Sequence, residues 1–331
     1  MAETMRAGAA PAARGRKGRQ ARDRRRGPRG ARRGPAQAGR GGLEKAKSRT
    51  GLLLVIPAFL FVAVFVLIPV GFAIYLSFTN YPLIGPYHWT GLQNWAAVGQ
   101  DATFVHSVLF TLEYTAIVTP AIFIVGYALA VLVRRRRRGS TLLRTLFFLP
   151  YVVGLVTESF ILLLELQPGS GGINAILHWL HLTNGQTAWL VHTNLALIAV
   201  CVLVVWFASG LTMVLLMAGM QGIPGDLLEA ASIDGASWLA QEFRIRMPLL
   251  RRTIALSLII SVVGSFLAFN QFYILTQGGP GTSTDTVVMW IYQVAFVQLH
   301  LGRATAMSLT LVVLVGIISF IQFYALRERE A

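Results

Sequence analysis

The chain is organised as long apolar blocks separated by short polar connections. Crossing the hydrocarbon core of a bilayer as a helix takes about 20 apolar residues, and six blocks reach that length: 51–78, 107–133, 145–166, 193–220, 253–276 and 304–326. Helix is expected because an open strand would leave backbone groups without hydrogen bonds in lipid. The pattern therefore predicts an all-α integral membrane protein with six transmembrane helices.

Basic residues orient these predicted spans. The connections 80–106, 167–192 and 277–301 contain no Lys or Arg, whereas 134–144 contains six and 221–252 contains four. Cytoplasmic loops of membrane proteins carry the excess of Lys and Arg. We therefore expect a multi-pass protein of the cell membrane with both termini and the two basic connections in the cytoplasm.

The first 50 residues differ in composition from the rest of the chain. They hold sixteen of the 29 Lys and Arg residues, which explains most of the net charge of +15, and they show no apolar periodicity. We expect 1–50 to be a disordered cytoplasmic tail that touches anionic lipid, and 51–331 to be the membrane domain. Nucleic acid is not an expected partner, because the tail has no aromatic residue on which bases could stack.

The connection 221–252 has the local chemistry of two short helices. Asp226 can cap a first helix with Glu229 three positions later, as in a capping box. Gly235 permits a sharp turn, and Ser237 can cap a second helix over 238–244. Four carboxylates share the polar face (Asp226, Glu229, Asp234 and Glu242). An anionic inner leaflet would repel them, so docking of a cytosolic partner fits better than a helix lying on the membrane.

The residues of this connection carry a family resemblance. Glu229-Ala230-Ala231, Gly235, Ile245 and Pro248 have the spacing of the EAA loop of ABC importer permeases, although Met247 replaces the Leu that the family has before the final Pro. The stretch 275–281, Leu-Thr-Gln-Gly-Gly-Pro-Gly, is similar to an outer loop of the sugar-permease branch. The chain thus resembles the first permease subunit of the maltose- and glycerol-phosphate-type group.

This resemblance implies the six-helix type I importer fold and a set of partners. It implies a second permease subunit in a heterodimer, two ATP-binding cassette ATPase subunits and an extracellular solute-binding protein. The loop would insert into a cleft on the ATPase as a coupling helix, through Asp226, Glu229, Ala230, Ala231, Asp234, Gly235, Ile245 and Pro248. The sequence has no phosphate-binding loop, so ATP hydrolysis belongs to another chain, and we expect no catalytic residue, cofactor or metal in this one.

Polar and aromatic residues within the fifth predicted span are candidates for the solute path. Ser265, Phe269 and Tyr273 are spaced at fours and would share one face of a continuous helix, with Asn270 beside them. An aromatic surface next to hydroxyl and amide groups suits a sugar. Packing between helices, where small and polar residues also gather, explains the same residues equally well.

Acidic residues within the predicted spans are also candidates. Glu158 and Glu165 are seven residues apart in the third span and would lie on one side of a helix, while Glu113 lies in the second. The deeper one, Glu158, must face protein or a wet cavity. It could contact a cationic or hydroxyl-rich solute, or it could pair within the protein.

The sequence is also compatible with other hypotheses about the solute and about the class of protein. The solute could be a polyol, a glycerol-phosphate diester or an amino sugar, although a phosphorylated solute would need a basic residue and the outer half has none before Arg303. A secondary transporter or channel would work without an ATPase. A membrane enzyme could pair Glu158 with one of the histidines, all of which fall in or beside the outer connections.

Overall fold

The computed structural model describes residues 54–82, 84–134 and 138–326, and the chain divides into two compact units, Met1–Val62 and Ala63–Ala331. The tail predicted at 1–50 lies outside the described residues. Of the first unit only 54–62 are described, and they are helical. The described part of the second unit is built from helices, with two isolated bridges, Thr79 with Trp89 and Pro82 with His300.

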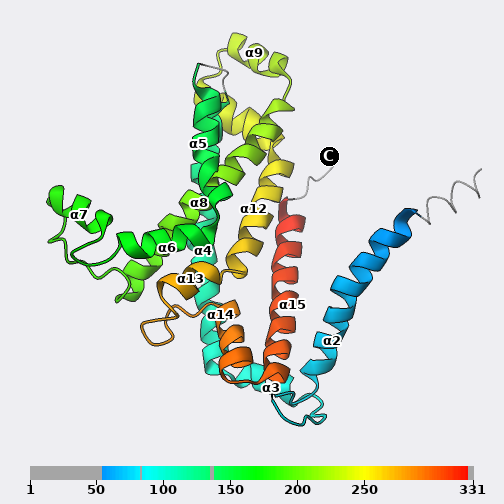
Figure 1. Cartoon of the computed structure of the whole chain (residues 1–331). Helices are drawn as coiled ribbons and strands as arrows, with labels where there is room; N and C mark the ends of the chain where they lie inside the picture. The colour runs from blue at the N-terminus through cyan, green and yellow to red at the C-terminus, as the bar shows by residue number, and fades with distance from the viewer. Residues whose placement is uncertain (1–53, 83, 135–137, 327–331) are drawn as a thin grey trace, which may run out of the picture. The chain divides into compact units, whose positions relative to one another are not determined.

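The second unit begins with a π-helical segment and continues through α-helices and two further π-helical segments (Figure 1). In chain order these are η1 Ala63–Leu67, α2 Ile68–Ser77, α3 Gln93–Gln100, α4 Ala102–Val133, α5 Ser140–Val153, α6 Leu155–Glu165, α7 Gly172–Trp179, α8 Thr193–Gln221, α9 Gly225–Ile233, α10 Trp238–Ala240, η2 Gln241–Arg246, α11 Met247–Leu249, α12 Arg251–Phe266, α13 Asn270–Leu275, α14 Val287–Tyr292, η3 Gln293–Val297 and α15 Leu301–Leu326.

Within the described ranges, five helical stretches are long and apolar enough to cross a membrane: Leu54–Ser77, Ala102–Val133, Thr193–Gln221, Arg251–Leu275 and Leu301–Leu326. The bent pair Ser140–Val153 and Leu155–Glu165 supplies the sixth apolar segment. The predicted all-α, multi-pass fold class is confirmed. Four spans begin earlier than predicted, since α4, α5, α12 and α15 begin at Ala102, Ser140, Arg251 and Leu301. For α4 the cause is a cap, because Asp101 accepts a hydrogen bond from the Phe104 amide (2.9 Å).

The prediction of one straight helix over 145–166 is wrong. α5 and α6 meet at an angle of 91° on either side of Gly154. The backbone of Gly154 has a φ of +95°, which glycine adopts without the steric penalty of a side chain, and its amide bonds to the Pro150 carbonyl (3.2 Å). Glu158 and Glu165 consequently lie on α6, which Figure 1 shows leaving the direction of α5 toward α7.

The fifth span is also interrupted, so the prediction that Ser265, Phe269 and Tyr273 share a face of one continuous helix is wrong. α12 ends at Phe266, and the backbone of Phe269 (φ −135°, ψ −60°) is not helical. The Ala268 carbonyl, which a continuous helix would use internally, instead accepts a hydrogen bond from the buried Thr286 hydroxyl (2.6 Å).

Helices also occur in the predicted outer connections. α3 lies in the first and α7 in the second. The third connection, 277–301, was expected to be a loop but contains α14 and η3. Figure 1 shows α3 at the end of the second unit opposite to α9.

The packing of α4, α5 and α8 sets the frame on which the candidate sites lie. Gly126 of α4 faces the Thr212 side chain of α8, and Gly210 of α8 faces the Phe147 backbone of α5, leaving no room for a methyl group at either glycine. Small residues at such positions let membrane helices approach closely. Further out, the buried ring of Phe272 on α13 packs edge-on against Tyr114 of α4 (5.1 Å between ring centroids).

Candidate coupling loop and solute path

The connection between the fourth and fifth spans forms a short exposed helix followed by a tight turn. α9 ends at Ile233, and Gly235 follows with a φ of +81°, in the left-handed region that glycine tolerates. The Ser237 hydroxyl then caps α10 by accepting a hydrogen bond from the Ala240 amide (3.3 Å). The predicted turn and second cap are confirmed, and Figure 1 shows α9 at the end of the second unit where α5 begins.

The predicted capping box at the start of this helix is wrong. Pro224 occupies the N-cap position and makes no side-chain hydrogen bond to the helix. Asp226 lies one residue inside α9, where its carboxylate is favoured by the positive end of the helix dipole rather than by a cap. The reason is local, because the helix begins after Pro224, two residues earlier than the sequence pattern of Asp226 and Glu229 indicated.

The side chains of the candidate coupling residues are largely accessible. Asp226, Glu229, Ala230, Asp234, Gly235 and Pro248 are exposed, and Ala231 and Ile245 are half-buried. Large apolar side chains accompany them: Ile233 is 87% exposed, and Trp238, Leu239 and Phe243 are more than half exposed. An exposed apolar patch rimmed by carboxylates is typical of a surface that another protein covers.

Glu242 does not belong to that accessible face, contrary to the expectation that its carboxylate points toward a partner. Glu242 is 1% exposed and forms ion pairs with Arg134 and with Arg246. Its other oxygen accepts a hydrogen bond from the Tyr127 hydroxyl (3.0 Å). Because Tyr127 and Arg134 belong to α4 and its C-cap, Glu242 joins the segment after α9 directly to a transmembrane helix.

A second set of bonds ties α9 to the same segment. The side-chain amide of Gln241 donates to the Ser232 hydroxyl (3.0 Å) and to the Ala236 carbonyl (3.1 Å). Gln241 and Glu242 are adjacent, so one residue holds α9 while the next holds α4. The sequence offered one signal for the ion cluster, since Glu242 and Arg246 are four residues apart in a helical stretch.

The candidate path residues of the fifth span separate into two groups. Ser265 is buried and its hydroxyl donates to the Ser261 carbonyl (2.8 Å), so it serves packing within α12. Asn270 is exposed at the start of α13. Phe269 and Tyr273 do come together, with stacked rings whose centroids are 5.1 Å apart.

Two aromatic residues missed by the sequence reasoning extend this pair. Tyr292 contacts Phe269 (5.2 Å) and Tyr273 (5.6 Å), and Phe296 contacts Tyr292 (5.3 Å). Tyr273 is 44% and Phe296 55% exposed, so the ladder presents ring faces on an accessible surface. We call these four residues the aromatic ladder. Tyr292 and Phe296 are four residues apart along α14 and η3, and this spacing was the signal in the sequence that could have placed their rings together.

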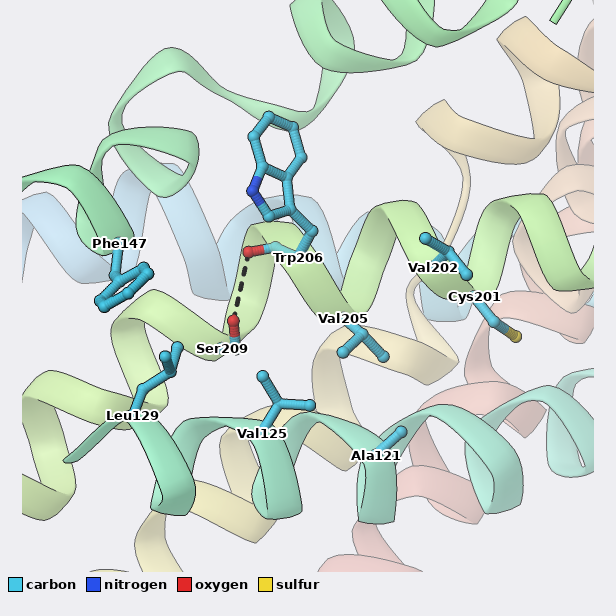
Figure 2. Close-up of a pocket in the computed structure, with 9 residues that line it drawn as sticks. All are labelled: Ala121, Val125, Leu129, Phe147, Cys201, Val202, Val205, Trp206 and Ser209. Atoms are coloured by element: carbon cyan, nitrogen blue, oxygen red, sulfur yellow. Dashed lines mark hydrogen bonds between the residues drawn. The ribbon is translucent and has the colours of Figure 1, made fainter. Parts of the chain in front are cut away.

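Two cavities flank Trp206 of α8. The one in Figure 2, about 540 Å³, lies between α4, α5 and α8, and its lining side chains are aliphatic or aromatic apart from Cys201 and the Ser209 hydroxyl. That hydroxyl donates to the Trp206 carbonyl (3.3 Å), which leaves little to orient a polar solute. The other cavity, about 530 Å³, lies between α5, α6 and α8 and is lined by both Glu158 and Glu165.

Arg303, the basic residue nearest the outer connections, is committed to an internal ion pair. Its guanidinium donates to Asp101 (2.6 Å), and the Trp290 indole donates to the same carboxylate oxygen (3.3 Å). This cluster fastens the start of α15 to the start of α4 and to α14. Arg303 is therefore poorly placed to bind a phosphate group of a solute.

The connection before α14 holds a buried carboxyl group. Asp285 is fully buried, and the Gln293 amide donates to its Oδ1 (3.1 Å), while Oδ2 has no hydrogen-bond partner among the described residues. Burial raises the pKa of Asp285 from 3.8 to about 6, and the bond from Gln293 partly opposes the shift. The folded state therefore holds this proton more tightly than the unfolded chain does.

We expect Asp285→Asn to flatten the pH dependence of stability. Because the folded pKa is raised, the stabilising contribution of protonated Asp285 is complete below 3.8 and is lost as the pH rises through about 6. The wild-type protein should lose more stability than the Asn variant between pH 5 and pH 7.5, measured by thermal unfolding of the detergent-solubilised protein. Parallel pH profiles for the two proteins would contradict this assignment.

The fold is shared with a chain of a bacterial ABC transporter. The protein superimposes on a subunit of the crystal structure of a bacterial ABC transporter involved in import of the acidic polysaccharide alginate with a TM-score of 0.75 at 21% identity, covering 87% of this chain and 99% of that one. A second crystal structure, of the alginate transporter in complex with an alginate pentasaccharide-bound periplasmic protein, gives a TM-score of 0.73 at 20% identity, covering 86% and 96%.

Sequence comparison gives the family. Residues 122–330 match the profile described as "Binding-protein-dependent transport system inner membrane component". The probable starch degradation products permease AmyD of Thermoanaerobacterium thermosulfurigenes is 33% identical over 84% of this chain and 94% of its own length. The lactose permease LacF of Rhizobium radiobacter is 30% identical over 89% of this chain and 100% of its own. The chain belongs to the family of binding-protein-dependent transport system inner membrane components, as the EAA spacing indicated.

Proposed function

We propose that this chain is the transmembrane permease subunit of an ATP-driven importer that moves a carbohydrate delivered by an extracellular solute-binding protein. Family membership supports the transport role, and the relatives named for starch degradation products and lactose support a sugar. The observation that carries the proposal is the exposed α9 and its turn, bound through Gln241 and Glu242 to a transmembrane helix.

The proposed assembly contains a second permease subunit and two ATP-binding cassette ATPases. Both termini and α9 would face the cytoplasm, and α3 would face outward, which agrees with the positions of α3 and α9 at opposite ends of the second unit (Figure 1). The ATPase would contact the exposed residues Asp226, Glu229, Ala230, Asp234, Gly235 and Pro248 of the loop, together with the half-buried Ala231 and Ile245.

The geometry supports a mechanical route for the coupling. When two ATPases close on ATP, α9 moves with the surface that holds it, and the bonds of Gln241 and Glu242 carry that displacement to α10, η2 and the end of α4. The segment runs on through α11 into α12 without a long loop, so the fifth span moves as well. The permease then alternates between two packed arrangements rather than deforming gradually.

The solute path is proposed to run along the aromatic ladder. Ring faces stack on the apolar C–H faces of a sugar, while Asn270 beside them supplies hydrogen bonds to hydroxyl groups. Phe269, Asn270 and Tyr273 therefore remain path residues, whereas Ser265 serves packing. A phosphorylated solute fits less well, because Arg303 is already paired with Asp101.

The test is uptake by the reconstituted complex. With the partner permease, the ATPases and the binding protein in proteoliposomes, we expect ATP-dependent accumulation of radiolabelled neutral oligosaccharides, and little accumulation of glycerol-phosphate diesters. Omitting the ATPase should stop uptake. Accumulation that persists without the ATPase would contradict the proposal and indicate a secondary transporter instead.

A further inference from the structure

A small cavity lies where the transmembrane helices α4 and α8 end, beside α9. Its volume is about 270 Å³, just under the roughly 300–1,000 Å³ of sites for drug-sized ligands, so it suits a smaller chemical group. The two helices pack together at this point, because Val133 and Met217 belong to one buried apolar cluster. The residues that line the cavity are the C-cap of α4, three residues of the last turns of α8, one of α9 and one of η2: Arg134, Met217, Met220, Gln221, Leu228 and Arg246.

The polar side chains of this cavity are two guanidinium groups and an amide. Arg134 and Arg246 both donate through Nη1 to the same oxygen of Glu242, so the guanidiniums are adjacent and exceed the carboxylate by one positive charge. Glu242 does not line the cavity, and its side chain is 2% exposed against 14% for each arginine. The carboxylate therefore lies behind the arginines, and the face that the cavity presents is cationic.

Both arginines keep donors that the protein does not use. A guanidinium carries five N–H groups in a planar fork, and Nε and Nη2 of Arg134 and Arg246 have no acceptor within the described ranges. Arg144 adds a further positive charge nearby, since its guanidinium donates to the Val133 carbonyl (2.8 Å) and to that of Arg134 (3.5 Å). Phosphate oxygens match both the charge and the fork geometry of guanidinium groups. The cavity thus has the donors for a phosphate group.

The position of the cavity indicates where such a phosphate group would come from. Ala102–Val133 and Thr193–Gln221 are long and apolar enough to cross a membrane, and the cavity lies at the end of both. This is the level of the lipid headgroups. Met217, Met220 and Leu228 give the cavity an apolar side that the glycerol and the first acyl carbons of a lipid can contact. Basic pockets between transmembrane helices on the cytoplasmic side bind anionic headgroups.

We propose that the phosphate group of an anionic phospholipid binds in this cavity, between the guanidiniums of Arg134 and Arg246. The inference rests on the proposed function, which places this end of the protein in the cytoplasm. A headgroup held there contacts α4 through Arg134, η2 through Arg246 and α9 through Leu228. The lipid therefore stabilises the junction through which α9 is connected to the transmembrane helices.

Retention of lipid by the assembled transporter tests this inference. The complex of permease and ATPase subunits is placed in nanodiscs of phosphatidylcholine with or without phosphatidylglycerol. Native mass spectrometry then counts the lipids that stay bound after transfer to detergent, and thermal unfolding is recorded in the nanodiscs. Arg246→Gln is the first test variant, and it leaves Arg134 and Glu242 paired one to one. Leu228→Trp is the second, and it fills the cavity while the ion cluster stays intact.

Arg244→Gln is the matched control for Arg246→Gln. It makes the same change of charge two residues earlier in η2, but Arg244 is exposed and does not line the cavity. The difference between the two variants therefore separates binding in the cavity from the general attraction of anionic lipid to a basic surface.

The wild-type complex should retain phosphatidylglycerol in preference to phosphatidylcholine. Phosphatidylglycerol should also raise its unfolding temperature, because a ligand that binds only the folded state stabilises it. Arg246→Gln should bind the lipid about tenfold more weakly, the usual effect of losing a hydrogen bond to a charged group. Leu228→Trp should lose the retained lipid, and Arg244→Gln should behave as wild type. If Arg246→Gln fails to assemble, Leu228→Trp decides the question.

Four results would overturn the inference. These are equal retention of the two lipids by wild type, wild-type retention in Leu228→Trp, a loss in Arg244→Gln as large as that in Arg246→Gln, and stabilisation by inorganic phosphate in pure phosphatidylcholine equal to that by phosphatidylglycerol, which would make the ligand a soluble anion. Sugar uptake by the complete system is measured in parallel in both lipid compositions. ATP-driven uptake alongside any of these results would leave the proposed function standing without the lipid site.

Discussion

Glu242→Ala should abolish ATP-driven uptake and lower the stability of the permease by roughly 3–5 kcal/mol, the usual effect of removing one partner from a buried ion pair. The substitution leaves the guanidinium groups of Arg134 and Arg246 facing each other without a shared carboxylate. Both arginines are 14% exposed, which lets water reach them and favours the lower end of that range. Thermal unfolding and proteoliposome uptake measure the two effects.

The double variant Glu242→Gln/Arg246→Gln separates charge from contact. It removes the repulsion between the arginines while keeping a polar neighbour for Tyr127, so it should recover part of the stability lost in Glu242→Ala. Glu229→Ala, which removes an exposed carboxylate of α9, should change stability by less than about 0.5 kcal/mol. Wild-type stability in Glu242→Ala would show that the ion cluster does not hold the loop to α4.

The transmembrane segments could be predicted because their lengths and apolar content follow from the thickness of a bilayer. The bend between α5 and α6 in the third segment could not be predicted from the sequence. Pro150 and Gly154 were both visible in the sequence, but membrane helices tolerate either residue when neighbouring groups satisfy the freed backbone. Whether they do so depends on contacts such as that between Gly210 and the Phe147 backbone, which connects residues far apart in the chain.

Within the candidate sites, too, features that depend on neighbouring residues could be predicted, whereas those that depend on contacts between distant residues could not. The turn at Gly235 and the cap at Ser237 depend on neighbouring residues, and the sequence predicted both. Glu242 has partners more than 100 residues away on α4, so its polarity alone suggested an exposed carboxylate. Tyr292 and Phe296 were missed for the same reason, because they join Phe269 and Tyr273 only when α14 folds beside the break after α12.

Gly235→Asp should abolish solute-stimulated ATP turnover, by about 100-fold or more, while the protein still inserts and folds. A β-carbon at Gly235 would meet no atom within 4 Å, so the chain itself has room for the side chain. Aspartate is among the residues that enter the left-handed region most readily, and the conformational cost should stay near 1–2 kcal/mol. The added carboxylate would instead occupy the space that the proposed ATPase surface needs.

Gly139→Asp is the matched control for this experiment. Gly139 also has a left-handed backbone, with a φ of +90°, and a β-carbon there would likewise meet no atom within 4 Å, but it precedes α5 rather than following α9. Both variants place one new carboxylate on a left-handed backbone, so a difference between them in ATP turnover reports on where that carboxylate lies. Wild-type ATP turnover in both Gly235→Asp and Gly139→Asp would mean that no ATPase surface covers the turn after α9. The ATPase would then have to contact the transmembrane helices through another part of the chain.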